Sequence, residues 1–210
     1  MKLPRAGVLS LQGDFDRHRA ALEALGAEAV RVTLPRDFEG LDALLMPGGE
    51  STTMLRLIAD TGMRAPLEAF VREKPVLGTC AGLILLGRGS ERLPAPPLGV
   101  LDCAVERNAY GRQIDSFSET VDAPALGPGA TFDAVFIRAP RIQALGAGVE
   151  VVARRGAEPV GVREGCSVGL CFHPELTRDL RFHRWFLAEV AGLELPGLPS
   201  AGAVSREAGA

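Results

Sequence analysis

The sequence predicts an α/β fold, with one doubly wound mixed sheet in a single three-layer αβα domain. In the first half of the chain, short apolar runs alternate with longer amphipathic runs, a pattern typical of parallel strands joined by helices. In the second half, short β-like runs follow one another with loops between them, which indicates antiparallel additions to the same sheet. The chain has 210 residues, 47% of them hydrophobic, which is enough for one substantial core.

The first half is interpreted as strands and helices in strict alternation. Gly26 ends the first helix, and a Gly-Gly turn separates the third strand from the helix that begins near Ser51. Such strand–helix–strand connections place successive strands parallel, with helices on both faces. The strands are expected at Ala6–Leu11, Ala29–Leu34, Leu41–Met46 and Pro75–Gly78, and the helices at Phe15–Leu25, from Ser51, at Ala65–Arg72 and at Ala81–Leu86.

The second half is interpreted as a run of short strands closed by one helix. The domain is expected to span residues 1–192, followed by a disordered tail over 193–210, because that segment is rich in Gly, Pro, Ala and Ser. The strands are expected at Val100–Glu106, Ser116–Val121, Ala134–Ile137, Val149–Arg154, Pro159–Arg163 and Ser167–Phe172, and the helix at Arg178–Val190.

Charge and hydropathy exclude several function classes. The formal net charge is −3, and a nucleic-acid partner would require a concentrated basic face. Arginines pair locally, Arg107 with Arg112 and Arg138 with Arg141. Such pairs are typical of a solvated face, but they could also bind a small carboxylate or a protein partner.

The chain is expected to be cytoplasmic and outside the membrane. No apolar run approaches the roughly 20 residues that span a bilayer, and the N-terminal residues lack the features of a signal peptide. The four cysteines show no paired spacing, so we expect free thiols and no metal site. One of them can therefore be a nucleophile.

Cys80 is the candidate nucleophile. The segment Gly78-Thr79-Cys80-Ala81-Gly82 has the form G-x-nucleophile-x-G, a sharp turn between a strand and a helix. The helix start favours the thiolate form of Cys80 and aims the Ala81 N–H at a developing oxyanion. An isolated cysteine is more often a buried packing residue, but the flanking glycines and the strand–helix context favour the nucleophile.

His173 is the candidate general base, with Glu175 as its orienting carboxylate. His173 follows the last predicted strand, at the sheet edge where doubly wound folds carry their sites. The His-x-Glu spacing across Pro174 lets the carboxylate reach the imidazole. The alternative is an ordinary turn that caps the last helix. His18 and His183 lie in helical stretches and are interpreted as surface or packing residues.

Gly48 and Gly49 follow the third predicted strand. Consecutive glycines allow backbone N–H groups to face a cleft, so an oxyanion role is plausible at this turn. The alternative is a tight connection with Ser51 or Thr52 as the helix N-cap.

Three motifs together resemble a known family. PGGES, GTCAG and FHPEL, in this order, resemble the class I (triad) glutamine amidotransferases and, among them, the glutaminase subunits of pyridoxal 5′-phosphate synthase. The resemblance runs from about residue 6 to 190 and implies a flavodoxin-like fold. The matching segments are Gly7–Gly13, Pro47–Met54, Gly78–Ile84, Glu106–Gln113, Asp115–Phe117, Phe136–Pro140 and Phe172–Thr177.

The resemblance also implies residue roles. Cys80 is the implied nucleophile, His173 the general base and then acid, and Glu175 its orienter, with no cofactor. Departures from the family pattern are small: Cys171 stands where a small residue such as Ser is expected, and Asp14-Phe15-Asp16 varies the start of the first helix. The implied L-glutamine contacts are Gly48, Gly49, Glu50, Arg107, Ile137 and Arg138, with Gly49 and Ala81 at the oxyanion hole.

The implied partner is a (β/α)8-barrel pyridoxal 5′-phosphate synthase subunit in a large hetero-oligomer, with the glutaminase weakly active until docked. Three alternatives stay open on the sequence. The chain could be the glutaminase of another pathway, such as guanine nucleotide, anthranilate or histidine synthesis. It could be a noncatalytic binding subunit with the same fold, or an esterase or peptidase using the same turn.

Overall fold

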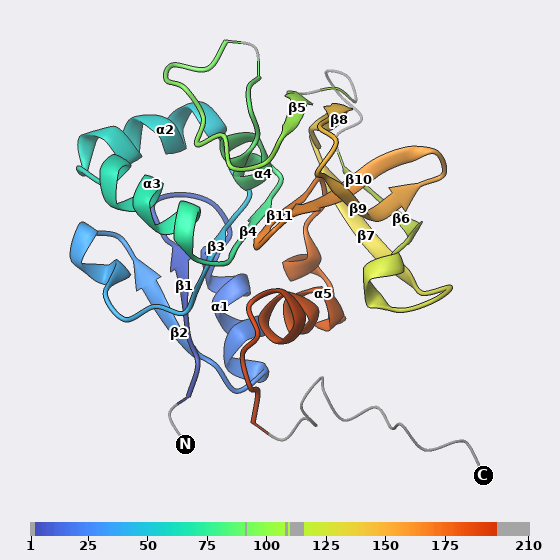
Figure 1. Cartoon of the computed structure of the whole chain (residues 1–210), viewed down its shortest axis with the longest axis horizontal. Helices are drawn as coiled ribbons and strands as arrows, with labels where there is room; N and C mark the ends of the chain where they lie inside the picture. Colours follow the sequence, from blue (N-terminus) through green and yellow to red (C-terminus); the bar gives the residue numbers. More distant parts are fainter. Residues whose placement is uncertain (1–2, 91, 108, 110–115, 197–210) are drawn as a thin grey trace.

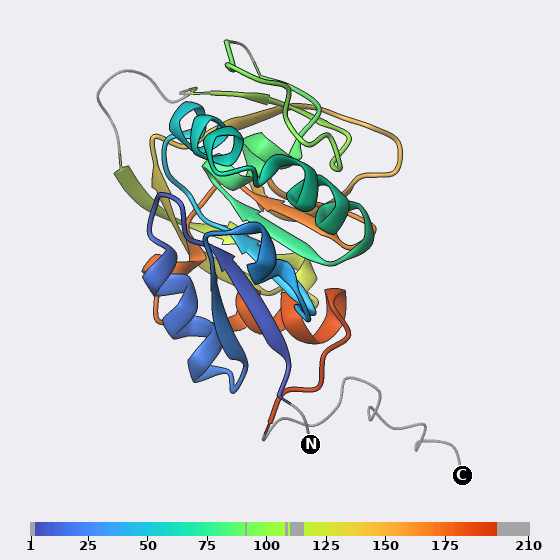
Figure 2. The ribbon, with the colours of Figure 1, turned by 90° about the vertical axis from the view of Figure 1, so that its left-hand side faces the viewer.

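A mixed sheet lies between two layers of helices in the computed structural model, which describes residues 3–90, 92–107, 109 and 116–196 (Figure 1, Figure 2). The predicted three-layer α/β class is confirmed. In the described residues the sheet contains β1 (Arg5–Leu9), β2 (Glu28–Val32), β3 (Ala43–Met46), β4 (Val76–Thr79), β6 (Ser116–Asp122), β7 (Thr131–Ile137), β9 (Glu150–Arg155), β10 (Glu158–Glu164) and β11 (Ser167–Leu170), and a separate pair joins β5 (Cys103–Glu106) to β8 (Arg141–Leu145).

The helices cover both faces of this sheet. Figure 2 shows α1 and α5 against one face and α2, α3 and α4 against the other. In α2, Met54, Leu55 and Ile58 are buried on one side at the spacing of successive turns, whereas α4 is buried along its whole length. The helices are α1 (Phe15–Ala24), α2 (Ser51–Asp60), α3 (Arg64–Glu73), α4 (Ala81–Leu86) and α5 (Arg181–Trp185), with 3-10 turns η1 (Pro35–Phe38), η2 (Pro124–Leu126) and η3 (Pro174–Leu176) and a π-helical turn η4 (Phe186–Val190).

The strand order is β2-β1-β3-β4-β11-β10-β9-β6-β7. The first five strands are parallel, because β1 pairs in parallel with both β2 and β3, β3 with β4, and β4 with β11. The carboxyl ends of β1, β3, β4 and β11 therefore meet at one edge of the sheet. This edge of a doubly wound sheet is where ligands bind.

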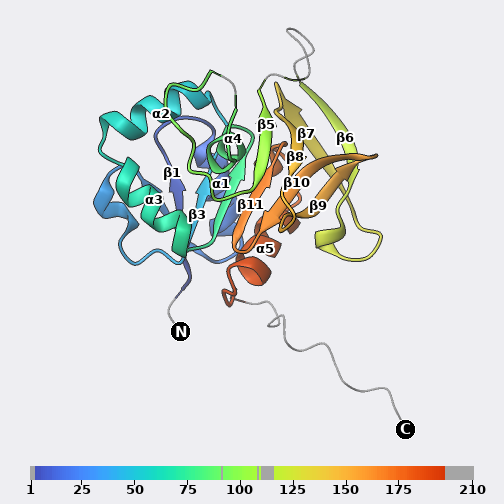
Figure 3. The same cartoon turned by 45° about the horizontal axis from the view of Figure 1, so that its top comes forward.

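The antiparallel strands curl back toward that same edge (Figure 3). β10 pairs with β11, β9 with β10, and the hairpin β6–β7 follows. Although β7 stands last in the strand order, its Val135 carbonyl accepts the backbone N–H of His173 at 2.8 Å. The end of β7 is thereby brought beside the segment that follows β11.

An aromatic cluster fills the space between the curled strands and α5. Phe172 and Phe182 are fully buried, with ring centroids 5.4 Å apart. Phe132 packs edge-on against Phe182 at 4.9 Å and lies 5.7 Å from Phe172. Phe172 therefore fixes, from the core side, the backbone that presents His173.

Several predicted bounds are wrong in the second half. The strand predicted at Val100–Glu106 begins only at Cys103, because the N–H groups of Val100 and Leu101 bond to the Leu86 carbonyl at the end of α4. β8 was not predicted. The remaining strand and helix bounds lie within about three residues of their predictions.

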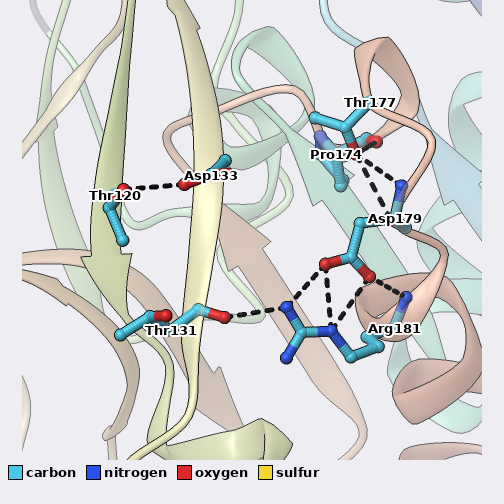
Figure 4. A network of polar contacts seen from close by, with 7 residues as sticks. All are labelled: Thr120, Thr131, Asp133, Pro174, Thr177, Asp179 and Arg181. Carbon is cyan, nitrogen blue, oxygen red and sulfur yellow. Dashed lines mark hydrogen bonds and ion pairs between the residues drawn. The ribbon is translucent and has the colours of Figure 1, made fainter.

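The closing helix also starts later than predicted. It begins at Arg181 rather than Arg178, because the Asp179 carboxylate accepts the Arg181 backbone N–H at 3.0 Å and pairs with the Arg181 guanidinium. The same guanidinium donates to the Thr131 carbonyl at 2.8 Å (Figure 4). This network ties the turn after Glu175 to the start of β7.

The described part of the predicted tail packs on the domain. Leu195 is buried, and Leu193 packs against the core. Residues 197–210, the rest of the predicted disordered tail, lie outside the described residues.

Within the described part of the chain, each helix is too short or too polar to cross a bilayer.

Replacing Phe182 by alanine tests the aromatic cluster. Phe182→Ala removes a buried ring and leaves a cavity, so the free energy of unfolding should fall by about 3–5 kcal/mol in urea denaturation. Leu34→Ala, at a side chain 37% exposed, is the control and should change it by less than about 1 kcal/mol. Equal losses in the two variants would contradict a core role for Phe182.

Candidate active site

Cys80 sits in a strained turn between β4 and α4. Its backbone adopts φ 50° and ψ −103°, a region that non-glycine residues rarely occupy, and it is the N-cap of α4 without a side-chain cap bond. A Cβ on Gly78 would approach the Gly82 carbonyl carbon to 2.6 Å, and a Cβ on Gly82 would collide with the Met46 carbonyl oxygen. The two glycines are therefore required by close backbone approach, as the G-x-C-x-G pattern predicts.

His173 and Glu175 form a buried pair at the carboxyl end of β11. Nδ1 of His173 lies 2.7 Å from Oε1 of Glu175, and both residues are almost fully buried. Glu175 lies in the 3-10 turn η3, whose first residue Pro174 stiffens the spacing between the two side chains. The carboxylate thus accepts the Nδ1–H and leaves Nε2 to face the site.

Cys80 and His173 converge on Gly48. A Cβ added to Gly48 would collide with the His173 ring and would lie 3.2 Å from Cβ of Cys80. The Cys80 thiol donates to the Ile137 carbonyl at 3.8 Å. Cys80 lies close enough to His173 to raise the pKa of the ring, although among the described residues Nε2 of His173 does not form a well-aligned hydrogen bond. Such bonds are often long without substrate and tighten when it binds.

The electrostatics of the pair favour a charged imidazole. Burial disfavours the charged ring, but the Cys80 sulfur and the Glu175 carboxylate outweigh it and raise the pKa of His173 to about 10. Burial likewise opposes ionisation of Glu175, but His18 and His173 outweigh it and lower its pKa to about 2. At neutral pH the ring is therefore an imidazolium held by a carboxylate, ready to give a proton from Nε2.

Two of the other cysteines, Cys171 and Cys103, are less suited to nucleophilic chemistry. Cys171 is fully buried, and burial raises its pKa well above the ordinary value. Burial also raises the pKa of Cys103 to about 11. A thiol that stays protonated is a poor nucleophile, so Cys171, which departs from the family pattern, does not compete with Cys80.

The Gly-Gly turn is supported by Gln12, for which the sequence predicted no role. Oε1 of Gln12 accepts the backbone N–H of Glu50 at 2.8 Å. A Cβ on Gly49, at φ 154°, would approach the same oxygen to 2.6 Å. Gln12 follows β1 at the sheet's carboxyl edge, a position that could have identified it.

Glu50 caps α2, rather than Ser51 or Thr52. Its carboxylate accepts the backbone N–H of Thr52 at 3.2 Å and that of Thr53 at 2.7 Å. Desolvation opposes ionisation, but the bonds from Thr53 and Thr52 outweigh it and lower the pKa of Glu50 to about 2. Nη2 of Arg107 lies 3.3 Å from Oε1 of Glu50, so the carboxylate and the guanidinium form an ion pair beside the Gly-Gly turn.

A cavity of about 300 Å³ joins these groups. Cys80 and His173 line it, and so do all six residues predicted to contact glutamine. A second cavity, of about 860 Å³, shares Arg107 but has no thiol or imidazole in its lining. The smaller cavity therefore brings Cys80 and His173 together with the residues predicted to bind glutamine. Its lining residues are Gly13, Asp14, Gly48, Gly49, Glu50, Ser51, Cys80, Ile84, Arg107, Ile137, Arg138 and His173.

The predicted pair of Arg138 and Arg141 does not form one site, and the predicted pair of Arg107 and Arg112 lies partly outside the described residues. Arg138, at φ 41°, lines the cavity, whereas Arg141 lies in β8 and bonds to Glu158 at 2.8 Å. Arg112 lies outside the described residues, as do Asn108 and the rest of 110–115 in the matching segments. His18 and His183, predicted as surface or packing residues, are both fully buried.

Comparison with known proteins places the chain among glutamine amidotransferases. The family model described as the SNO glutamine amidotransferase family matches residues 8–192. Pyridoxal 5′-phosphate synthase subunit PdxT of Thermus thermophilus is 52% identical over 190 residues, covering 89% of this chain and 97% of the relative. The PdxT of Thermotoga maritima is 48% identical over 187 residues, with 89% and 99% covered. A crystal structure titled as a glutamine amidotransferase superposes with a TM-score of 0.83 at 49% identity, covering 90% of this chain and 99% of that one.

The lowered pKa of Glu175 predicts a pH-dependent contribution to stability. A carboxyl whose pKa falls from 4.5 to about 2 on folding stabilises the fold fully above pH 4.5 and loses this effect as the pH falls toward 2. The advantage of the wild type over Glu175→Gln in free energy of unfolding should therefore shrink between pH 5 and pH 3 by on the order of 2 kcal/mol.

Urea denaturation of both proteins at several pH values measures this advantage. Glu150→Gln, at an exposed carboxyl, is the matched control and should differ little from the wild type at each pH. A Glu175→Gln deficit that stays constant from pH 7 to pH 3 would refute the assignment.

Proposed function

The chain belongs to the SNO glutamine amidotransferase family, and from this premise we propose that it hydrolyses L-glutamine to L-glutamate and ammonia. The observation that supports this most directly is the strained Cys80, which shares a 300 Å³ cavity with His173 beside the buried Glu175. Nucleophile, base and orienting carboxylate in this arrangement form the parts of a hydrolytic triad.

In the first half-reaction, the Cys80 thiolate attacks the side-chain amide carbon of glutamine. The carbonyl oxygen becomes an oxyanion, and the N–H of Ala81 at the start of α4 and the N–H of Gly49 are the proposed donors. The tetrahedral intermediate collapses when the C–N bond breaks and His173 transfers its Nε2 proton to the leaving nitrogen. Ammonia leaves, and a γ-glutamyl thioester stays on Cys80.

In the second half-reaction, water hydrolyses the thioester. The neutral His173 takes a proton from the attacking water, and the new intermediate expels the Cys80 thiolate. Glutamate leaves, and His173 is again an imidazolium held by Glu175. The reaction uses only protein groups and water, so it requires no metal or organic cofactor.

The glutamine molecule is proposed to be held by groups of both charge signs. Its α-carboxylate suits Arg107 or Arg138, and its α-ammonium suits Glu50, all of which line the cavity. Ile137 presents the carbonyl that the Cys80 thiol contacts, so it borders the reacting centre. Gly48 leaves room for substrate between Cys80 and His173 because it has no side chain.

The proposed partner is the synthase subunit that consumes the ammonia. The similar proteins of Thermus and Thermotoga are named as subunits of pyridoxal 5′-phosphate synthase, which supports a synthase partner here. We propose a (β/α)8-barrel synthase in a large hetero-oligomer, with ammonia passed through a channel so that it is neither lost nor protonated. The proposed location is the cytoplasm, where the Cys80 thiol stays reduced.

Replacing Cys80 tests the proposed chemistry. Cys80→Ala should abolish glutamine hydrolysis and covalent labelling by a diazoketone analogue of glutamine, because no thioester can form. Ammonia release and mass spectrometry of the labelled protein are the measurements. Cys166→Ala, at a half-buried thiol at the other end of β11, is the matched control and should keep both properties. Hydrolysis that survives in Cys80→Ala would refute the proposed nucleophile.

The open geometry around Nε2 of His173 predicts that activity depends on the partner. The purified chain alone should release ammonia slowly, and adding the synthase subunit should raise the rate several-fold or more, because docking aligns Cys80 with His173. The comparison is made at saturating glutamine with a fixed amount of chain. Equal rates with and without the synthase would contradict this prediction.

A further inference from the structure

Two buried histidines lie behind the Glu175 carboxylate. His18 comes from α1 and His183 from α5, and Nδ1 of His18 lies 3.0 Å from Nε2 of His183. On its other side, Nε2 of His18 lies 3.3 Å from Oε2 of Glu175 and 3.3 Å from the hydroxyl of Thr79. The pair therefore contacts both the carboxylate that holds His173 and the residue that precedes Cys80.

Both histidines are neutral at neutral pH. Burial lowers the pKa of His18, although Glu175 acts in the opposite direction. Burial and the neighbouring His18 lower the pKa of His183 to about 3. Each ring thus carries a single N–H, and two directions of hydrogen bonding are possible along the pair.

The carboxylate selects one of these directions. If the His18 proton were on Nδ1, the lone pair of Nε2 would face Oε2 of Glu175 at 3.3 Å, and two negative regions would repel each other. With the proton on Nε2, the N–H dipole points into the region shared by Oε2 and the Thr79 hydroxyl. Nδ1 of His18 must then accept the Nε2–H of His183.

The far end of the pair selects the same direction. Among the described residues Nδ1 of His183 has no hydrogen-bond partner and is buried. If His183 accepted from His18, this Nδ1 would carry a buried N–H without an acceptor, which proteins rarely tolerate. If His183 donates, Nδ1 carries only a lone pair, which is the less costly unpaired group. Both ends of the pair therefore favour donation from Nε2–H of His183 to Nδ1 of His18.

We propose that His18 is a positioning residue of the site: its Nε2–H, fixed by the bond from His183, holds the outer oxygen of Glu175 so that the inner oxygen faces His173. The N–H groups then point in one direction, from His183 to His18 and from His18 toward Thr79 and Oε2 of Glu175, while His173 donates to Oε1 of Glu175 from the other side. Oε2 of Glu175 has no hydrogen bond of standard geometry within the described residues, but Nε2 of His18 lies 3.3 Å from it and acts on it through the N–H dipole.

This proposal rests on the proposed glutaminase function and adds a residue that acts through Glu175 rather than on substrate. Without the His18 N–H, the buried carboxylate loses one of its two partners and can rotate, and the imidazolium of His173 is held less firmly. The ionisable groups that interact electrostatically with His18 are Glu175, His173 and His183. The exposed Asp14, at the start of α1, also contributes. A change in pH dependence in a His18 variant must be assigned among these groups.

Three variants of His18 separate positioning from packing. His18→Leu fills the space without a donor, His18→Gln places an N–H near the position of Nε2, and His18→Asn places one near Nδ1. Leu22→Ala, one turn along α1 and equally buried, is the matched structural control because it disturbs the helix packing without removing a hydrogen-bond donor. Circular dichroism and thermal unfolding establish which variants fold.

The readouts are steady-state glutamine hydrolysis in the presence of the synthase and the pH profile of Cys80 alkylation by iodoacetamide. We expect His18→Leu to lose on the order of 10- to 100-fold in kcat, with KM little changed, by comparison with outer partners of metal-bound histidines. The midpoint of the alkylation profile should move to higher pH by about one unit, because a weaker imidazolium stabilises the thiolate less. His18→Gln should keep kcat and the midpoint of the alkylation profile close to the wild-type values. Leu22→Ala should leave the midpoint of the alkylation profile unchanged.

Several results would overturn the proposal. One is a folded His18→Leu with the kcat and alkylation midpoint of the wild type. Another is equal impairment of His18→Gln and His18→Leu, or the same midpoint shift in Leu22→Ala, since either would indicate packing alone. If His18→Leu does not fold, His18→Gln must outperform His18→Asn, and the reverse order overturns the proposal. Alkylation needs no glutamine, so a wild type that hydrolyses none would end the proposed function while the alkylation series still decides the role of His18.

Discussion

The buried contact between Glu175 and His173 is the interaction on which the rest of the site depends. A carboxylate with no exposed side-chain surface is costly to bury, and only partners in fixed positions offset that cost. Here the imidazolium on one side and His18 on the other keep the pKa of Glu175 low. The same contact fixes which nitrogen of His173 faces Cys80, so stability and chemistry come from one arrangement.

That contact can form only because the topology brings distant segments to one sheet edge. Four parallel strands end there and deliver Gln12, Gly48, Cys80 and His173 from sequence positions up to about 160 residues apart. A parallel sheet places its carboxyl ends together, so each of these four strands contributes the loop that follows it. The antiparallel strands add the fifth segment, because the bond from His173 to Val135 draws the end of β7 beside them.

Strain and rigidity are distributed unevenly around the cavity. Cys80 and Arg138 hold positive φ angles, which are unfavourable for residues with a Cβ, and both line the cavity. The packed Phe172 on one side of His173 and the Asp179–Arg181 network after Glu175 hold the surrounding backbone. Surroundings packed in this way can maintain the strained backbone of Cys80 and Arg138, which line the cavity.

The sequence by itself determined the features that depend on local patterns. Alternating apolar and amphipathic runs predicted the parallel half of the sheet. The close-packed G-x-C-x-G turn and the His-Pro-Glu spacing pointed to Cys80, His173 and Glu175 as a candidate triad, and the structure brings these residues close together. In each case the physical cause lies within a few residues of the chain: periodicity, a glycine required by backbone approach, or a proline that fixes a turn.

Only the tertiary structure decided the features that depend on pairing between distant segments. β8 was missed because its pairing with β5 leaves no regular apolar alternation, and the return of β7 to the site follows from sheet curvature that no local pattern encodes. Likewise, Glu50 was not recognised as a helix cap, nor His18 and His183 as neighbours of Glu175. A buried histidine on an amphipathic helix has the same local pattern whether it touches an apolar side chain or a carboxylate, because its partner is chosen by the packing of another helix and another strand.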